Sequence, residues 1–284
     1  MARTKRREAM HRSRWLVAGM VATLCLAASA AASGSPATRT NACTGLDGAL
    51  TAKSPGTRAF HSLARQALGH GCAAYVSTAS PATLGLEFLR GPETGTTVVI
   101  GPTGVQLTDL ALTPSGTLYG IDFDSFYRVD PDTAQSTLIG PVDATVNGLV
   151  VGSRGTIYAS TREVGQLLTI NPLTGAGTLV GNSGFLSAGD LAFAQDGTLY
   201  MTARLSTDAL PSLLATLDPA TGAGTLVGPI GQDNVFGLVS SYGTLFGMTS
   251  DGDLLTIDPS TGAGTVVATG GPSIFGATSL PSAP

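Results

Sequence analysis

The residues of this chain whose spacing could support chemistry are two aspartates at matched positions of an internal repeat. Asp109 and Asp190 occupy this position in two copies, and the other copies carry Gly148, Gly237 and Gly276 there. Carboxylates that converge on one point can bind a divalent cation or a ligand with hydroxyl groups. Two acids can also perform acid–base chemistry when their surroundings separate their pKa values. A structural interpretation stays open beside these, in which the glycines narrow the spacing between repeats.

Loop aromatics offer a different candidate site for binding. They are five aromatic residues of loops and strand starts: Phe123, Phe126, Tyr127, Phe236 and Phe275. Thr108 and Asn147 each stand one position before a matched residue of the repeat, and Asn147 belongs with the two aspartates as a candidate for ligand binding. A small apolar patch with acids at its rim would suit a protein, peptide or glycan partner. The alternative is that the aromatic side chains fill gaps between neighbouring repeats.

The distribution of reactive residues limits enzyme chemistry. After Cys72 the chain contains no His, Cys, Lys or Trp. Nucleophilic triads, lysine Schiff bases and histidine-ligated metals are therefore excluded from that region. His61 and His70 flank a predicted helix, where a solvent-facing or helix-end role is favoured over catalysis. We predict no catalytic residues and no cofactor, and a calcium ion held by Asp109 and Asp190 is the alternative.

Two landmarks define the repeat that must position these residues. A segment that begins at Leu254, Leu-Leu-Thr-Ile-Asp-Pro-Ser-Thr-Gly-Ala-Gly-Thr-Val-Val, occurs with changes five times. A Gly-Thr-aliphatic-aromatic landmark begins at Gly116, Gly155, Gly197 and Gly243, with intervals of 39, 42 and 46 residues. A four-stranded β-propeller blade has about this length.

The turn in the first landmark has a physical explanation. Asp-Pro-x-Thr-Gly predicts a type I turn, with Asp accepting backbone hydrogen bonds and Gly in the left-handed conformation. Ala134 stands at that Gly position in the second copy and would cost about 1 kcal/mol there. Because turn formation explains these aspartates, metal binding at the turns is not favoured.

The two ends of the repeat region predict how the ring closes. Ala73–Thr78 aligns with a second strand and has no inner strand before it, whereas Ser273–Ala277 aligns with an inner strand and has no blade of its own. We therefore predict an all-β propeller over residues 72–284 with five four-stranded blades. The first blade, 72–101, is completed by the C-terminal strand, which removes exposed sheet edges.

The first residues are typical of a secretory signal peptide. Six Arg or Lys residues precede an apolar run from Trp15 to about Ala28, shorter than the roughly 20 residues of a membrane-spanning helix. We predict a signal peptide over residues 1–32, no membrane anchor and an extracellular location. Ordinary Sec export is favoured, and the Arg6-Arg7 pair leaves twin-arginine export open.

Residues 33–71 are predicted to precede the propeller as a mobile leader and a short helix. The leader ends near residue 53, and apolar residues at helical spacing predict the helix over 57–68, with Thr57 as its cap. Cys43 and Cys72 are the two cysteines left after signal cleavage, so an exported chain would join them in a disulfide.

Charge and motifs together indicate the class of protein. After Cys72 the chain has five Arg, no Lys and 17 Asp plus Glu, which disfavours nucleic-acid binding. The Asp-Pro-x-Thr-Gly-Ala turn, the Gly-Thr-Leu-Val-Gly strand and the Asp-Gly-Thr-Leu-Tyr landmark at residues 196–200 resemble secreted bacterial β-propeller repeat proteins of the broad NHL and YVTN type. Streptogramin lyase-like relatives carry Trp in the landmark strand and a catalytic His. This chain has Tyr or Phe there and no propeller His, which counts against lyase activity.

The function that follows is an exported, non-enzymatic propeller, predicted to be a monomer, that binds a protein or glycan partner. The alternative is a metal-dependent hydrolase, lactonase-like, with a channel cation at Asp109 and Asp190.

Overall fold

A computed structural model describes residues 36–207 and 210–280. The predicted signal peptide lies outside these residues. None of the helices within the described ranges is long and apolar enough to cross a membrane.

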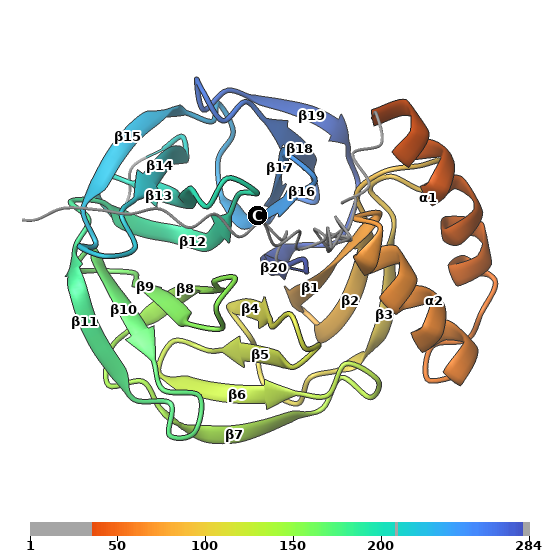
Figure 1. Ribbon diagram of the computed structural model, residues 1–284, viewed down its shortest axis with the longest axis horizontal. Helices are drawn as coiled ribbons and strands as arrows, with labels where there is room; N and C mark the ends of the chain where they lie inside the picture. The colour runs from red at the N-terminus through yellow and green to blue at the C-terminus, as the bar shows by residue number, and fades with distance from the viewer. Residues whose placement is uncertain (1–35, 208–209, 281–284) are drawn as a thin grey trace, which may run out of the picture. The chain divides into compact units, whose positions relative to one another are not determined.

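The described chain forms five antiparallel sheets of four strands each, arranged as the blades of a ring (Figure 1). In each blade the first strand named is the innermost and the last is the outermost. Blade 1 contains β20 (Ile274–Thr278), β1 (Ala73–Ala79), β2 (Ala82–Phe88) and β3 (Thr97–Pro102). Blade 2 contains β4 (Asp109–Leu112), β5 (Leu118–Ile121), β6 (Ser125–Val129) and β7 (Ser136–Pro141). Blade 3 contains β8 (Val146–Val151), β9 (Ile157–Thr161), β10 (Gln166–Ile170) and β11 (Gly177–Asn182). Blade 4 contains β12 (Leu186–Phe193), β13 (Leu199–Arg204), β14 (Leu213–Leu217) and β15 (Gly224–Pro229). Blade 5 contains β16 (Val235–Ser241), β17 (Thr244–Thr249), β18 (Leu254–Ile257) and β19 (Gly264–Ala268).

Ring closure follows the prediction from the sequence. The last strand, β20, pairs antiparallel with β1, with Tyr75 opposite Thr278 and Ser77 opposite Gly276. Blade 1 is therefore built from the two ends of the repeat region, and the predicted five-bladed propeller is confirmed.

The repeated turn has the predicted aspartate acceptor and left-handed glycine, and its backbone hydrogen bond joins residues four apart. In the last copy the backbone N–H of Gly262 donates to the carbonyl of Asp258 at 2.8 Å, and the N–H of Ser260 donates to Asp258 Oδ1 at 2.8 Å. Gly262 has a φ of 82°, and Ala134 adopts the same left-handed region with a φ of 66°. The repeat geometry thus overrides the steric preference of alanine at this position.

Outer strands pack against the turn of the next blade. A Cβ added to Gly181 in β11 would overlap the carbonyl oxygen of Thr221, which lies in the turn of blade 4. The glycine that ends each Gly-Thr-Leu-Val-Gly segment therefore allows neighbouring blades to approach closely.

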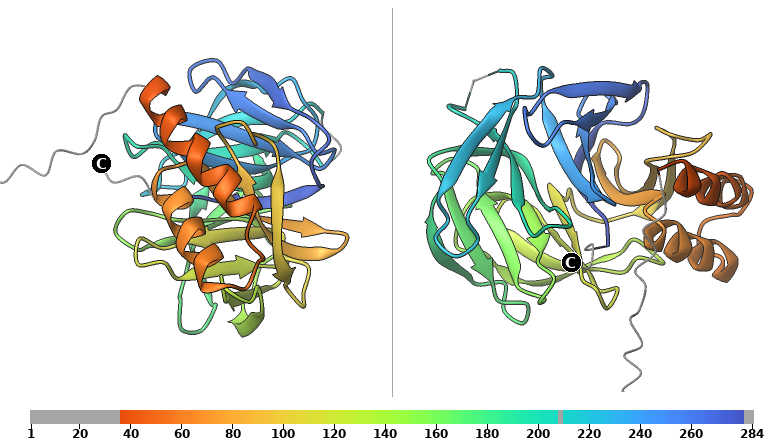
Figure 2. Two further views of the ribbon diagram at one scale, coloured as in Figure 1. Left: turned by 90° about the vertical axis from the view of Figure 1, so that its right-hand side faces the viewer. Right: turned by 45° about the horizontal axis from the view of Figure 1, so that its top comes forward.

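Two helices precede the ring, α1 (Pro36–Thr51) and α2 (Arg58–Gly69). Figure 2 shows them side by side against the outside of blade 1. The helix predicted over 57–68 is confirmed, with the Thr57 hydroxyl accepting from the N–H of Phe60 at 3.2 Å. The prediction of a mobile leader up to residue 53 was wrong, because α1 occupies most of that segment. Its side chains from residue 43 on are held by tertiary contacts, which a local pattern does not reveal.

The disulfide between Cys43 and Cys72 is confirmed and joins α1 to the start of β1. His61 is buried and does not face solvent as predicted, because its Nδ1 lies 3.1 Å from Asp132 Oδ1 in the turn of blade 2. The helical segment thus contacts two blades of the ring.

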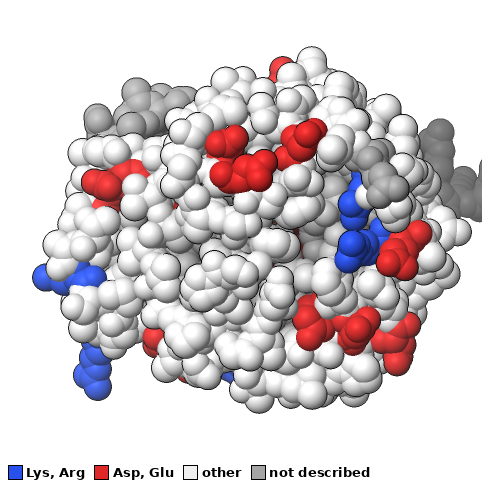
Figure 3. Space-filling model, turned by 180° about the vertical axis from the view of Figure 1, so that it is seen from behind, with Lys and Arg blue, Asp and Glu red and all other residues white. Residues whose placement is uncertain are grey.

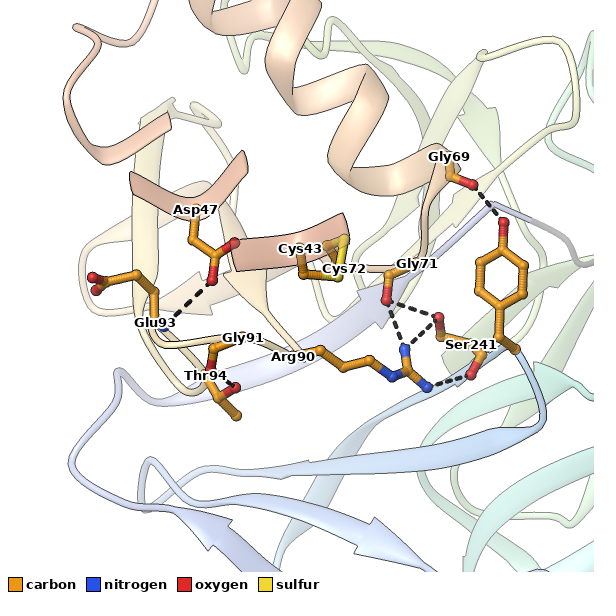
Figure 4. The surroundings of a disulfide bond; sticks show 11 residues. Cys43, Asp47, Gly69, Gly71, Cys72, Arg90, Gly91, Glu93, Thr94 and Ser241 are labelled. Atoms are coloured by element: carbon orange, nitrogen blue, oxygen red, sulfur yellow. Dashed lines mark hydrogen bonds between the residues drawn. A yellow bond between two sulfur atoms is a disulfide. The ribbon is translucent and has the colours of Figure 1, made fainter. Parts of the chain in front are cut away.

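Arg90 joins the first and last blades beside the disulfide (Figure 4). Its guanidinium donates to the carbonyl of Gly71 at 2.6 Å and to the carbonyl of Ser241 at 2.7 Å. The same group lies over the ring of Phe246, 4.8 Å from the ring centroid. Side-chain contacts therefore reinforce the seam that β20 closes through the backbone.

Candidate functional site

Asp109 and Asp190 meet in the centre of the ring, and we call them the acid pair. Both side chains are completely buried, and a hydrogen bond joins the two carboxyl groups. The repeat explains this convergence, because equivalent positions of inner strands approach the same axis. The sequence-based expectation that these two residues lie together is met.

Backbone amides surround the acid pair. Asp109 accepts from its neighbour Leu110 at 2.7 Å and from Leu149 of β8 at 2.5 Å. Asp190 accepts from its neighbour Leu191 at 2.6 Å. Its second oxygen accepts from Leu238 of β16 at 2.6 Å and from Ala277 of β20 at 3.1 Å. Asp109 lies in β4 and Asp190 in β12, and their carboxyl groups accept hydrogen bonds from β8, β16 and β20. Two carboxyl groups therefore connect all five inner strands.

Burial controls the protonation of the pair. Removal from water raises the pKa of Asp190 to about 8 and raises the pKa of Asp109 well above its usual range, with a further increase from the nearby Asp190 carboxylate. The hydrogen bond between the carboxyl groups raises the pKa of Asp109 and lowers that of Asp190. The two acids therefore titrate as a coupled pair, and the pair keeps its protons to higher pH than exposed aspartates do.

A glycine makes room for this arrangement. A Cβ added to Gly276 would overlap the Cα of Asp109 and lie 2.5 Å from its Oδ1. The interpretation that glycines at this repeat position narrow the spacing of the inner strands is correct for β20.

A pocket lies at the end of the channel where the inner strands begin, and we call it the wide mouth. Its volume is about 110 Å³. Four of the predicted binding residues line it, together with two arginines and three small residues: Asn147, Phe123, Phe236, Phe275, Arg162, Arg204, Thr108, Ala188 and Gly189. Neither aspartate of the acid pair lines it. In Figure 3, which looks from behind the view of Figure 1, a basic group lies beside a hollow near the middle of the molecule, and acids lie farther out.

Several side chains of the wide mouth contact one another or the nearby backbone. The rings of Phe236 and Phe275 have centroids 5.6 Å apart with planes at 40°. The guanidinium of Arg162 lies 5.0 Å from the centroid of the Phe123 ring, at a cation–π distance. Arg204 Nη1 donates to the carbonyl of Thr207 at 3.2 Å.

Asn147 is a buried amide in this lining. Its Nδ2 donates to the carbonyl of Ser187 in β12 at 3.3 Å. Its Oδ1 has no hydrogen-bond partner among the described residues, although the side chain is 95% buried. An acceptor in this condition favours a ligand that donates a hydrogen bond.

Sequence reasoning missed the two arginines, although the repeat carries a signal for them. Phe123, Arg162 and Arg204 each follow the aromatic residue of the landmark strand by four positions. They therefore occupy equivalent places after the second strand of blades 2, 3 and 4, and all three line the wide mouth.

Phe126 and Tyr127 do not join this pocket. Phe126 is buried between blades 2 and 3 and stacks on Tyr119, with centroids 4.9 Å apart. Tyr127 is buried in the cluster that includes α2 and blade 1, and its hydroxyl donates to Asp122 Oδ2 at 2.7 Å. These two aromatic residues fill gaps between elements.

The opposite end of the channel, which we call the narrow mouth, is different. Its cavity is about 30 Å³, and it is lined mainly by aliphatic residues at the ends of the inner strands, such as Leu112, Val151 and Leu280. No group of three or more His, Cys, Asp or Glu side chains suited to a metal ion occurs anywhere in residues 36–207 and 210–280.

Comparison with known proteins places the chain by fold. No protein-family model matches the sequence, and no curated protein matches it. The structure is similar to a structural genomics protein of unknown function from Bacteroides thetaiotaomicron VPI-5482, with 13% identity, a TM-score of 0.52, and coverage of 73% of this chain and 62% of that chain. This likeness supports the β-propeller and, at such identity, shows the fold alone.

Two further similar structures have diverse roles. One is a nidogen/laminin complex, with 16% identity, a TM-score of 0.49, and coverage of 75% of this chain and 82% of that chain. The other is the PQQ-bound aldose sugar dehydrogenase from Streptomyces coelicolor, with 19% identity, a TM-score of 0.42, and coverage of 57% of this chain and 67% of that chain.

Proposed function

We propose that this chain is an exported, non-enzymatic β-propeller that binds a protein or carbohydrate partner at the wide mouth. One observation carries the proposal. Four predicted binding residues from separate blades and two arginines surround one pocket of about 110 Å³. Pockets with apolar walls and a few convergent polar groups are typical of ligand sites.

The chemistry of the lining supports binding over catalysis. The pocket has aromatic, amide and guanidinium groups, and within the part of the chain that the structure describes no Asp, Glu, His or Cys lines it. Arginine and aromatic side chains are the residues on which binding energy usually depends.

Two features support export. The described chain contains a disulfide, and disulfides persist mainly in oxidising compartments. The first 32 residues carry the basic and apolar pattern of a secretory signal peptide.

The acid pair gives less support to the alternative, a hydrolase with a channel cation at Asp109 and Asp190. Five backbone N–H groups point at the carboxyl oxygens, so the sites that a cation would occupy face hydrogen-bond donors. The raised pKa of both acids also favours a protonated form, which binds metal poorly.

The first experiment is a binding screen of the exported protein against glycans and peptides, with wild type and a Phe236→Ala, Phe275→Ala variant. We expect the variant to lose binding at least about tenfold, since aromatic anchors of this kind contribute a few kcal/mol. Leu173→Ala is the matched control, because Leu173 is 85% exposed in the distant turn of blade 3.

Equal binding by wild type and the double variant would contradict the location of the site. Turnover of a bound lactone or ester that requires calcium and the acid pair would instead favour the hydrolase.

A further inference from the structure

We infer that the wide mouth binds a sugar that carries a carboxylate, of the uronic acid type, and this inference rests on the proposed binding function. Three features of the pocket lead to this chemistry: a pair of guanidinium groups, an aromatic wall and a buried amide acceptor.

The guanidinium groups favour an anion. Arg162 and Arg204 come from adjacent blades and line the same pocket, and no acid among residues 36–207 and 210–280 shares the lining. Within the described residues Arg162 forms no ion pair, and its contact is with the face of Phe123. Guanidinium groups bind carboxylates through paired hydrogen bonds.

The aromatic wall favours an apolar face on the ligand. Phe236 and Phe275 are half-buried and lie side by side across blades 5 and 1. The C–H face of a sugar ring is apolar and flat enough to pack on such a surface. A simple inorganic anion would leave this wall without a contact.

The amide favours a hydroxyl group. Asn147 Oδ1 is an acceptor with no hydrogen-bond partner in the described chain, while its Nδ2 is engaged with β12. A ligand hydroxyl would satisfy this acceptor, whereas a second carboxylate would be repelled by it. An aliphatic or aromatic acid without hydroxyl groups meets only two of the three features.

Size and charge limit the ligand to about one ring. The pocket of about 110 Å³ corresponds to roughly eight water-sized volumes, close to the extent of a monosaccharide. Acidic groups lie around the basic group beside the hollow in Figure 3, and the chain after Cys72 has 17 acids and five arginines, so this charge opposes a polyanion. We therefore assign the site to a single acidic sugar or to the acidic end of an otherwise neutral glycan.

The test is titration of D-glucuronate and D-galacturonate into the full mature protein, followed by calorimetry and amide chemical shifts. We expect at least one uronate to bind at least about tenfold more tightly than glucose, which has the ring without the carboxylate. Benzoate, which has the carboxylate without hydroxyl groups, should also bind more weakly. Rising salt should weaken uronate binding, because the guanidinium–carboxylate attraction is screened.

Variants locate the site. Arg162→Ala with Arg204→Ala should lose uronate binding at least tenfold, and Asn147→Leu should remove the preference for uronate over benzoate. Arg154→Ala is the matched control, because Arg154 is an exposed arginine of the same blade 3 that lies outside the wide mouth. If the double variant does not fold, Arg162→Gln alone, combined with the salt series, tests the same prediction.

The outcomes separate this inference from the proposed function. Equal binding of glucose and glucuronate that depends on Phe236 and Phe275 would overturn the carboxylate inference and keep the binding function. Tight binding of a peptide with a free C-terminal carboxylate, without uronate binding, would also overturn the inference. If neither sugars nor peptides contact the wide mouth, the proposed function itself fails.

Discussion

The two ends of the central channel are built from the same five inner strands, yet they differ in size and chemistry. The wide mouth has a cavity of about 110 Å³ with two arginines, three phenylalanines and a buried amide, whereas the narrow mouth has about 30 Å³ and mainly aliphatic walls. The acid pair lies within the ring and lines neither cavity. The repeat therefore supplies the same strand framework at both ends, and the residues where the inner strands begin determine what can bind.

The largest expected effect comes from removing the carboxyl group of Asp190. In Asp190→Ala, the buried amides of Leu191, Leu238 and Ala277 lose their acceptor. At about 1–3 kcal/mol for each unpaired donor, unfolding free energy should fall by on the order of 5 kcal/mol. Urea unfolding at pH 5, where Asp190 is protonated in the folded protein, measures this loss.

Asp190→Asn is the matched variant, since it keeps an oxygen acceptor and the side-chain volume. Its loss should be smaller than that of Asp190→Ala. Equal, small losses in both would mean that the acid pair does not hold the inner strands together.

The acid pair shows how much a repeat can predict. Matched positions of a propeller converge on its axis, so the proximity of Asp109 and Asp190 followed from their places in the repeat. The same rule, applied four residues after each landmark aromatic, would have placed Arg162 and Arg204 beside Phe123. What the repeat does not encode is burial and protonation, because these depend on amides from three other strands.

Other features lay beyond sequence reasoning for separate physical reasons. Phe126 and Tyr127 are adjacent in one strand, so their side chains point to opposite faces and enter different gaps between elements. Helix α1 lacks a strong apolar pattern, and its contacts come from distant residues, such as Cys72 for Cys43. Asp47 in the same helix accepts from the backbone N–H of Glu93 at 3.4 Å.

The next effect in size is the pH dependence of stability. The pKa of Asp190 is raised to about 8 in the folded protein, above the usual value of an unfolded aspartate. The folded state therefore binds the proton more tightly. The stability this contributes is complete below about pH 4 and is lost as pH rises to about 8, at up to about 1.4 kcal/mol per pH unit.

Thermal melting between pH 5 and pH 8 should show a falling melting temperature, which the Asp190→Asn variant should flatten. Glu87, whose burial raises its pKa to about 7, acts in the same direction and stays present in that variant. Asp109 also stays in that variant, so the difference between the two profiles isolates the contribution of Asp190. Parallel profiles would show that Asp190 does not carry a raised pKa.

The smallest expected change in unfolding free energy comes from substitutions at the wide mouth. The contrast between the two ends of the channel predicts that its residues serve binding and contribute little to stability. Arg162→Ala removes a guanidinium that stacks on Phe123, a ring that is 37% exposed. Exposed cation–π contacts contribute about 0.5–1 kcal/mol, so unfolding free energy should change by no more than this. A double-mutant cycle with Phe123→Leu measures the coupling directly.

A loss of unfolding free energy above about 2 kcal/mol in Arg162→Ala would make Arg162 a structural residue. A small loss of unfolding free energy together with a loss of ligand binding would show that the two sites have different roles. The acid pair would still hold the inner strands together while the wide mouth no longer bound its ligand.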